Sequence, residues 1–213
     1  VLRSADGMTW NLVFQGDRSN GGYCYFAFIL SPLSDGKMLF LFPYHDYNYR
    51  IDYAYFDGSR WSSQQQVYKG IESGRKYDVI SACGNDADTV HIIRLDDSGH
   101  VQYCTYTFPD IWSDDTAIET EHTDKCPNIG MTENIYVFYI YNDIIHMRRR
   151  SGVWEDEATP FGRSFASPAY VIAEMRSPSP MIGVAWREGA RNPYTINFGL
   201  LSEAVCHCNG SPV

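Results

Sequence analysis

The sequence has 213 residues, of which 15% are aromatic, and its formal net charge is −9 with a pI near 5.0. This acidic balance argues against a nucleic acid or an anionic membrane surface as a partner, because both attract basic proteins. No apolar run is long enough for a membrane-spanning helix. The length suits one domain over residues 1–213, and sixteen Tyr, eleven Phe and five Trp favour β-strands.

In chain order, short strand-like runs alternate with turn signals, and each group of runs ends on a tryptophan. Alternating apolar positions mark the strands, and Asp, Asn, Ser and Gly clusters mark the turns. The turn signals lie at 34–36, 96–99 and 142–143. The predicted strands are 23–30, 38–44 and 50–56 before Trp61; 79–83, 89–95 and 101–108 before Trp112; and 129–131, 135–141 and 144–149 before Trp154.

The tryptophans themselves are regularly spaced. Trp10, Trp61, Trp112 and Trp154 follow one another at intervals of 51, 51 and 42 residues, and each ends a similar short phrase such as Asp-Gly-Ser-Arg-Trp at 57–61. A more polar run suited to an outer strand comes next, at 62–68 and at 113–119. Periods of about 40 to 50 residues are typical of β-propeller blades.

The last group of strands, at 169–173, 181–186 and 194–201, lacks the closing phrase, which stands instead at residues 6–10, before 11–15. A propeller closes its ring in this way, because the N-terminal strand completes the final blade and protects the sheet edges. The sequence therefore predicts an all-β fold, a small β-propeller of four four-stranded blades closed by the N-terminal strand. Five tighter blades are one alternative, and a β-sandwich or barrel with unrelated tryptophans is the other.

The repeated phrases resemble those of the fucose-specific lectin type of β-propeller, most closely at 89–112 and next at 37–61. In that family each sugar lies between adjacent blades and is held by an Arg, a Glu and an aromatic residue. This chain keeps the tryptophan, but Phe40, His91 or Tyr136 stands where the Arg would fall, and Tyr53, Tyr103 and His146 stand where the Glu would fall. The resemblance therefore implies a diverged lectin with a ligand other than fucose.

Carbohydrate binding needs flat apolar surfaces for CH faces and planar polar groups for hydroxyls. The repeated tryptophans can supply the first, and an aromatic loop at 44–50 offers both. Alternatively, the tryptophans pack each blade onto the next, and the loop is an ordinary hairpin turn. The candidate ligand-binding residues are Trp10, Trp61, Trp112, Trp154, Tyr53, Tyr103, His146, Tyr47, Tyr49 and Arg50.

Signatures of catalysis are absent from the sequence: there is no Gly-x-Ser-x-Gly elbow, no His-Glu-x-x-His and no phosphate-binding glycine loop. The histidines and acidic residues lack metal-ligand spacing, so we assign no catalytic residue, metal or cofactor. The sequence indicates a lectin-like module that binds a glycan or glycoprotein. A small propeller hydrolase or lyase acting on a glycan, and a protein–protein interaction scaffold, are the alternatives.

Six cysteines, at 24, 83, 104, 126, 206 and 208, indicate disulfides and an oxidising compartment, with buried thiols as the alternative. Ring closure suggests a bond from Cys24 to Cys206 or Cys208. The sequon Asn209-Gly210-Ser211 fits a secreted glycoprotein, and the absence of an initiator Met and of a signal peptide fits a processed mature form. We therefore expect the protein to be secreted.

Overall fold

In a computed structural model of the chain, the structure describes residues 2–3, 11–12, 29–44, 50–67, 81–84, 88–96, 98–118, 127–161, 181–188 and 195–202. These residues form sixteen short strands and one 3-10 helix, η1 (Ser34–Gly36). The prediction of an all-β chain is therefore confirmed for them. Among the same residues, no helix has the length and apolar character needed to cross a membrane.

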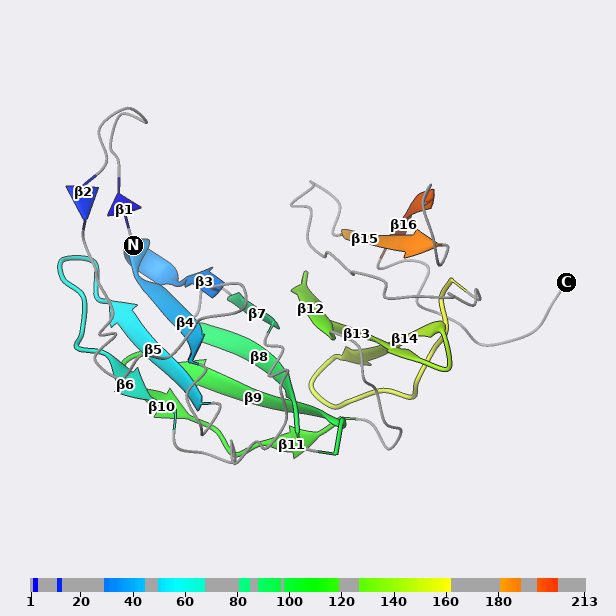
Figure 1. Cartoon of the computed structure of the whole chain (residues 1–213), viewed down its shortest axis with the longest axis horizontal. Helices are drawn as coiled ribbons and strands as arrows, with labels where there is room; N and C mark the ends of the chain where they lie inside the picture. The colour runs from blue at the N-terminus through cyan, green and yellow to red at the C-terminus, as the bar shows by residue number, and fades with distance from the viewer. Residues whose placement is uncertain are drawn as a thin grey trace, which may run out of the picture.

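Five antiparallel sheets follow one another along the described parts of the chain, a short pair of strands near the N-terminus and then sheets I to IV (Figure 1). Sheet I contains β3 (Ile29–Pro32), β4 (Met38–Tyr44), β5 (Arg50–Phe56) and β6 (Gln65–Gln66). Sheet II contains β7 (Ser81–Gly84), β8 (Thr89–Leu95), β9 (Val101–Thr107), β10 (Ile111–Trp112) and β11 (Thr116–Ala117). Sheet III contains β12 (Asn128–Met131), β13 (Ile135–Tyr141) and β14 (Ile144–Arg150), and sheet IV contains β15 (Met181–Glu188) and β16 (Thr195–Ser202).

The predicted turns set the register of these sheets. Asn142 and Asp143 both have positive φ, 49° and 59°, which matches the two-residue turn that joins β13 to β14. Between β8 and β9, the Asp96 carboxylate accepts hydrogen bonds from the backbone N–H groups of Ser98 and His100, each at 2.9 Å. Gly99 there has a φ of 83°, which glycine adopts without strain.

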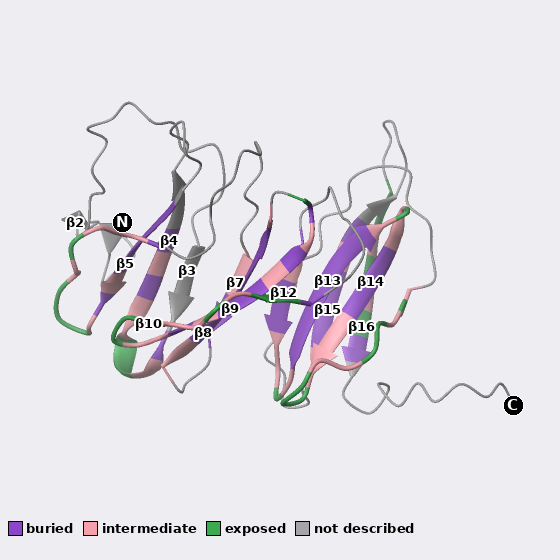
Figure 2. Cartoon of the chain, turned by 90° about the horizontal axis from the view of Figure 1, so that it is seen from below, coloured by how far each residue is buried: buried purple, intermediate pink, exposed green. Residues whose placement is uncertain are grey.

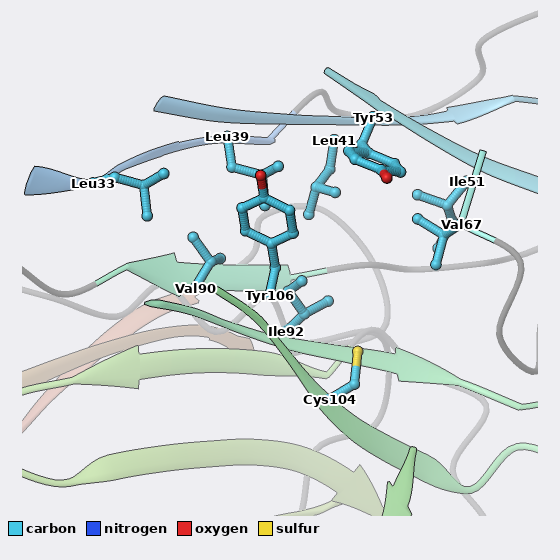
Figure 3. Packing of buried hydrophobic residues seen from close by; sticks show 10 residues of the cluster. All are labelled: Leu33, Leu39, Leu41, Ile51, Tyr53, Val67, Val90, Ile92, Cys104 and Tyr106. Carbon is cyan, nitrogen blue, oxygen red and sulfur yellow. The ribbon is translucent and has the colours of Figure 1, made fainter. Parts of the chain in front are cut away.

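Successive sheets pack face to face, and each contact surface, here called a seam, holds its own apolar core (Figure 2). The I/II seam is drawn in Figure 3, where Tyr106 extends from β9 toward Leu39 of β4. The buried residues of each seam come from two neighbouring sheets. They include Leu39, Leu41, Tyr53, Val90, Ile92 and Tyr106 in the I/II seam; Ile93, Val101, Tyr103, Val137 and Tyr139 in the II/III seam; and Tyr136, Phe138, Ile182, Val184 and Trp186 in the III/IV seam.

Strand β8 shows why the strands of this protein have apolar residues at nearly every position. Val90 and Ile92 pack in the I/II seam, whereas Ile93 and Leu95 pack in the II/III seam. Because side chains alternate between the two faces of a strand, a sheet covered on both faces needs apolar residues at odd and even positions alike.

The first strands of the sheets lie side by side: β3 contacts β7, and β7 contacts β12. The backbone N–H of Ile129 donates to Oγ of Ser81 across the second of these contacts, at 3.3 Å. Sheets that stack face to face while their first strands converge have the arrangement of propeller blades around a hub.

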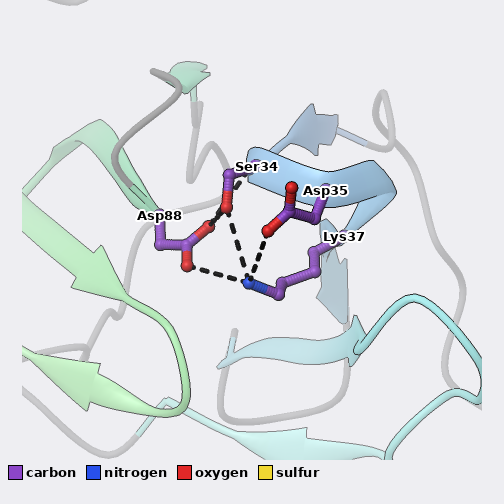
Figure 4. Close-up of polar contacts among 4 residues, drawn as sticks. All are labelled: Ser34, Asp35, Lys37 and Asp88. Atoms are coloured by element: carbon purple, nitrogen blue, oxygen red, sulfur yellow. Dashed lines mark hydrogen bonds and ion pairs between the residues drawn. The ribbon is translucent and has the colours of Figure 1, made fainter.

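A polar clamp joins sheets I and II beside β3 (Figure 4). The Asp88 carboxylate accepts from the backbone N–H of Ser34 at 3.1 Å and from Nζ of Lys37 at 3.0 Å. Lys37 Nζ also lies 5.0 Å from the ring centroid of Phe108. These bonds hold the pKa of Asp88 below its usual value, chiefly through Ser34 and then Lys37.

The two ends of this row of sheets differ from the prediction. Strands β1 (Leu2–Arg3) and β2 (Asn11–Leu12) pair only with each other, and β15 and β16 do likewise within the described residues. Closure of the last sheet by the N-terminal strand is therefore not seen, and it stays a prediction. On the face of sheet IV away from sheet III, Ile196, Phe198 and Leu200 are exposed.

The cysteines require a correction. Cys83 packs in the II/III seam and Cys104 in the I/II seam, on opposite faces of sheet II, and neither forms a disulfide. The expectation of disulfide bonding was therefore wrong for these two residues, which match the alternative of buried thiols. Cys24, Cys126, Cys206, Cys208 and the sequon at Asn209 lie outside the described residues.

Candidate functional site

The three described tryptophans of the repeat have the same local structure. Each forms a bridge with the end of the third strand of its own sheet, and the next backbone N–H donates to a carbonyl of that strand at 2.8–2.9 Å. The repeated phrase is therefore a turn that returns the chain along the sheet edge. The bridges are Trp61–Phe56, Trp112–Tyr106 and Trp154–Arg150, and the hydrogen bonds run from Ser62 to Tyr55, Ser113 to Thr105 and Glu155 to Arg149.

Two of these tryptophans pack against a tyrosine of the preceding sheet. The ring of Trp112 lies edge-on to Tyr53 at 5.1 Å between centroids, and Trp154 lies edge-on to Tyr103 at 5.2 Å. Trp61 contacts Phe40 and Phe56 of its own sheet. Packing of one blade onto the next is thus a role of Trp112 and Trp154, which are both only half-buried.

The sequence predicts that His146 occupies the position equivalent to Tyr53 and Tyr103. In the structure Met147 occupies that position instead. Tyr53 pairs with Gln65 of the outer strand and Tyr103 with Thr116, but the corresponding partner in sheet III, Ala158, pairs with Met147. Met147 packs in the III/IV seam, whereas His146 stacks on Tyr139, which belongs to the II/III seam. The turn before Trp154 is shorter than the other two, so counting back from the tryptophan shifted the register by one residue.

Sequence reasoning missed a second repeated feature, a polar latch formed by the third residue after each tryptophan. Gln64 donates from Nε2 to Asp52, Asp115 accepts from Nη2 of Arg94 at 2.6 Å, and Glu157 bonds His146. In each case this residue ties the returning chain to its own sheet. The equal spacing of 64, 115 and 157 from the tryptophans is the signal that could have revealed it.

The latch of sheet III joins His146 to Glu157. Nδ1 of His146 lies 2.6 Å from Oε1 of Glu157, and Nε2 lies 3.2 Å from the carbonyl oxygen of Tyr141. Burial favours a higher pKa for Glu157, but hydrogen bonds from Tyr139 and His146 outweigh it and hold that pKa below its usual value.

The II/III seam combines aromatic and polar groups beside Trp154. Nδ1 of His91 lies 2.7 Å from the hydroxyl of Tyr103, and the guanidinium carbon of Arg150 lies 5.5 Å from the Tyr103 ring centroid. Burial, followed by the charge of Arg150, lowers the pKa of His91 to about 4, and burial raises the pKa of Tyr103 to about 12. Both side chains are therefore neutral hydrogen-bonding groups at pH 7.

The I/II seam has the same aromatic pair but different polar groups. The hydroxyl of Tyr53 donates to the Asp110 carboxylate and lies 2.9 Å from Oε1 of Gln65. Burial and the bond to Asp110 raise the pKa of Tyr53. Tyr106 fills the position that Arg150 has in sheet III, and it is completely buried against Trp112.

The remaining candidates lie outside what the structure describes. These are Trp10, Tyr47, Tyr49 and the side chain of Arg50, whose backbone begins β5 opposite Tyr44. Within the described ranges, no group of three or more His, Cys, Asp or Glu side chains could hold a metal ion.

No protein-family model matches the sequence, and no curated protein matches it either. Solved structures share its fold. The Aleuria aurantia lectin, a six-bladed β-propeller, is 8% identical with a TM-score of 0.51, and the match covers 78% of this chain and 57% of the lectin. A mutant of that lectin in complex with α-methyl-L-fucoside is 7% identical with a TM-score of 0.52, and the match covers 78% of this chain and 56% of the mutant.

Two further structures have comparable scores. The SapL1 lectin in complex with α-methyl fucoside is 11% identical with a TM-score of 0.50, over 90% of this chain and 68% of its own. A polysaccharide lyase of family PL25, an ulvan lyase, is 10% identical with a TM-score of 0.51, and the match covers 81% of this chain and 52% of the lyase. The chain thus spans little more than half the length of the Aleuria lectin. At these identities the shared feature is the fold: the chain has the stacked antiparallel sheets of a β-propeller, like those lectins.

Proposed function

We propose that the chain is a carbohydrate-binding domain and that it holds a sugar at the rim of the II/III seam, against Trp154. The supporting observation is the grouping of a half-buried tryptophan with the hydrogen-bonded pair His91–Tyr103, contributed by two adjacent sheets. In the described part of the chain, the I/II seam has the aromatic pair but no histidine beside it.

The chemistry of these groups suits a sugar. A pyranose packs its CH face on an indole ring, while its hydroxyls exchange hydrogen bonds with groups that both donate and accept. Neutral His91 has one ring nitrogen that donates and one that accepts, and the Tyr103 hydroxyl does both. The similar lectins were solved with α-methyl fucoside, which supports a glycan ligand. Because His91 and Tyr103 stand where that family places Arg and Glu, we propose a sugar other than fucose.

The test is a glycan-array screen followed by calorimetric titration of the strongest hit. The Trp154→Ala variant is expected to lose about tenfold or more in affinity, since a nucleic-acid base stacked on one aromatic side chain contributes roughly 1–3 kcal/mol by alanine substitution. Trp61→Ala is the matched control, because Trp61 has the same local turn and contacts its own sheet. An array with no hits from folded protein, or equal losses in both variants, would contradict the proposal.

The similarity to the ulvan lyase supports a second candidate, cleavage of a polysaccharide at the same propeller. Its readout is the ultraviolet absorbance of unsaturated sugar products during incubation with an anionic polysaccharide. A rise in absorbance would replace the binding-only function with an enzymatic one. Tyr139, whose hydroxyl donates to Glu157, is fully buried, so we place no catalytic role there.

Secretion and closure of a four-bladed ring are further proposals. The exposed apolar side chains of Ile196, Phe198 and Leu200 on sheet IV support closure, because such a face is normally covered. Small-angle X-ray scattering tests closure directly. A compact disc-like particle is expected, and an elongated monomer would contradict it.

A further inference from the structure

Strand β14 presents a column of basic side chains to sheet II. His146, Arg148 and Arg150 occupy alternate positions, so they share one face of the strand. Two contacts identify that face as the one in the II/III seam: Arg150 lies over the ring of Tyr103, and His146 stacks on Tyr139. Arg149 lies on the opposite face, with its Nε 3.6 Å from Glu155.

Among the described residues, Glu157 is a carboxylate next to this column, and the charge of Arg148 is one of the smaller causes that lower its pKa. Glu157 is already engaged by His146 and by the hydroxyl of Tyr139. Arg148 and Arg150 form no ion pair with any described side chain, and the buried Nε of Arg148 has no hydrogen-bond partner there. A buried guanidinium N–H without an acceptor is costly, so Arg148 is equipped to receive an anion, and Arg150 lies next to it on the same face of the strand.

The fold does not require these charges. The positions in sheet II that correspond to His146, Arg148 and Arg150 are held by Gln102, Cys104 and Tyr106. That equivalent column is uncharged, and Cys104 and Tyr106 are buried in the I/II seam. The same architecture therefore forms with apolar or neutral residues, so it does not require Arg148 and Arg150.

Building on the proposed carbohydrate-binding function, we infer that the ligand of the II/III seam is an anionic saccharide, a uronic acid or a sulfated sugar. Arg148 and Arg150 bind its carboxylate or sulfate group, and Trp154 packs on its ring. Guanidinium groups suit this role because their planar N–H forks bind two oxygens of a carboxylate or sulfate at once. The chain carries a net charge of −9, so this cationic pair is a local feature and not part of a basic surface.

The experiment is a set of calorimetric titrations of the whole chain. Methyl β-glucuronide is compared with methyl β-glucoside, which differs only in lacking the carboxylate, and with a sulfated galactoside paired with its unsulfated form. We expect the anionic member of at least one pair to bind about tenfold more tightly than its neutral counterpart, and the preference to shrink as salt rises. The pair that shows the preference tells uronate from sulfate.

Three variants locate the anion. Arg148→Gln and Arg150→Gln are each expected to remove most of the anionic preference, while Arg149→Gln, from the same run of arginines but on the other face, keeps it. Thermal melts of all three establish that they fold. Equal losses in the three variants, or a preference that survives Arg148→Gln combined with Arg150→Gln, would overturn the inference.

The outcomes separate this inference from the function beneath it. Binding of a neutral sugar that depends on Trp154, with no anionic preference, refutes the inference and leaves carbohydrate binding intact. Binding of inorganic sulfate as tightly as of the sulfated sugar, unaffected by Trp154→Ala, refutes a saccharide ligand for the arginines. Failure of every sugar to bind folded protein refutes both.

Discussion

The I/II and II/III seams are two versions of one interface, built from equivalent strands by one chain. Both place a tryptophan of the later sheet edge-on to a tyrosine of the earlier one, at 5.1 and 5.2 Å. The I/II seam completes this pair with Tyr106, which is entirely buried, whereas the II/III seam completes it with Arg150. Both seams hold an apolar core, but the I/II seam has a buried phenol ring where the II/III seam has a guanidinium group. The difference teaches that a repeated scaffold can specialise one interface while its copy maintains the fold.

The largest expected effect is on the free energy of unfolding, and it distinguishes Tyr106 from Arg150, its counterpart in sheet III. Tyr106→Ala should destabilise the protein by about 3–5 kcal/mol, because it removes a fully buried aromatic ring. Arg150→Ala, at the equivalent position, should cost no more than about 1 kcal/mol, since it removes one cation–π contact at a half-buried site. Denaturant unfolding of both variants measures this. Similar losses in the two would mean that the seams do not differ in kind.

The latch of sheet II should show the next largest effect. Asp115→Ala leaves the buried guanidinium of Arg94 without its 2.6 Å partner, and we expect a loss of about 3 kcal/mol in unfolding free energy. In sheet III, Glu157 is more exposed, so Glu157→Ala should cost less. Replacing Arg94 and Asp115 together by Met and Ala serves as the control. If the double variant is as unstable as Asp115→Ala alone, the loss does not come from the unpaired guanidinium of Arg94, which would contradict the role given to this ion pair.

A smaller effect is expected on the pH dependence of folding stability, to which only the II/III seam should contribute through His91. The pKa of His91 is about 4 in the folded protein and near its usual 6.5 when unfolded, so the unfolded state binds the proton more readily. Stability should therefore be complete above pH 6.5 and fall by roughly 1–3 kcal/mol as the pH decreases toward 4. Leu39 holds the equivalent position in sheet I, so the I/II seam contributes nothing similar. His91→Leu should flatten this part of the pH profile measured by thermal unfolding; an unchanged slope would count against a neutral, buried His91.

The order of strands and turns could be predicted from sequence, and specific contacts could not. Alternating apolar runs and the turn at Asn142-Asp143 are local signals, so they identified β13 and β14 correctly. Assigning His146 to the position of Tyr53 failed because the turn before Trp154 is shorter than those before Trp61 and Trp112, and no local signal fixes that register. The pair Arg94–Asp115 joins residues 21 positions apart, so only the folded sheet brings them together.

The candidate site shows the same limit. The tryptophan at 154 and the tyrosine at 103 could be chosen from their repeat positions alone. The importance of Arg150 could not, because three consecutive arginines point alternately to the two faces of a strand, and only the packed sheets show which face meets sheet II. That neither Arg148 nor Arg150 forms an ion pair with a described side chain is likewise a property of the packed sheets.

The most direct test of the central claim, that the II/III seam is the binding site, is a crystal structure of the chain with a bound saccharide, methyl β-glucuronide or the best array ligand. We expect sugar density against Trp154, with its acidic group within hydrogen-bond distance of Arg148 or Arg150. Density against Trp112 in the I/II seam, or on another surface at full occupancy while the II/III seam stays empty, would contradict the account.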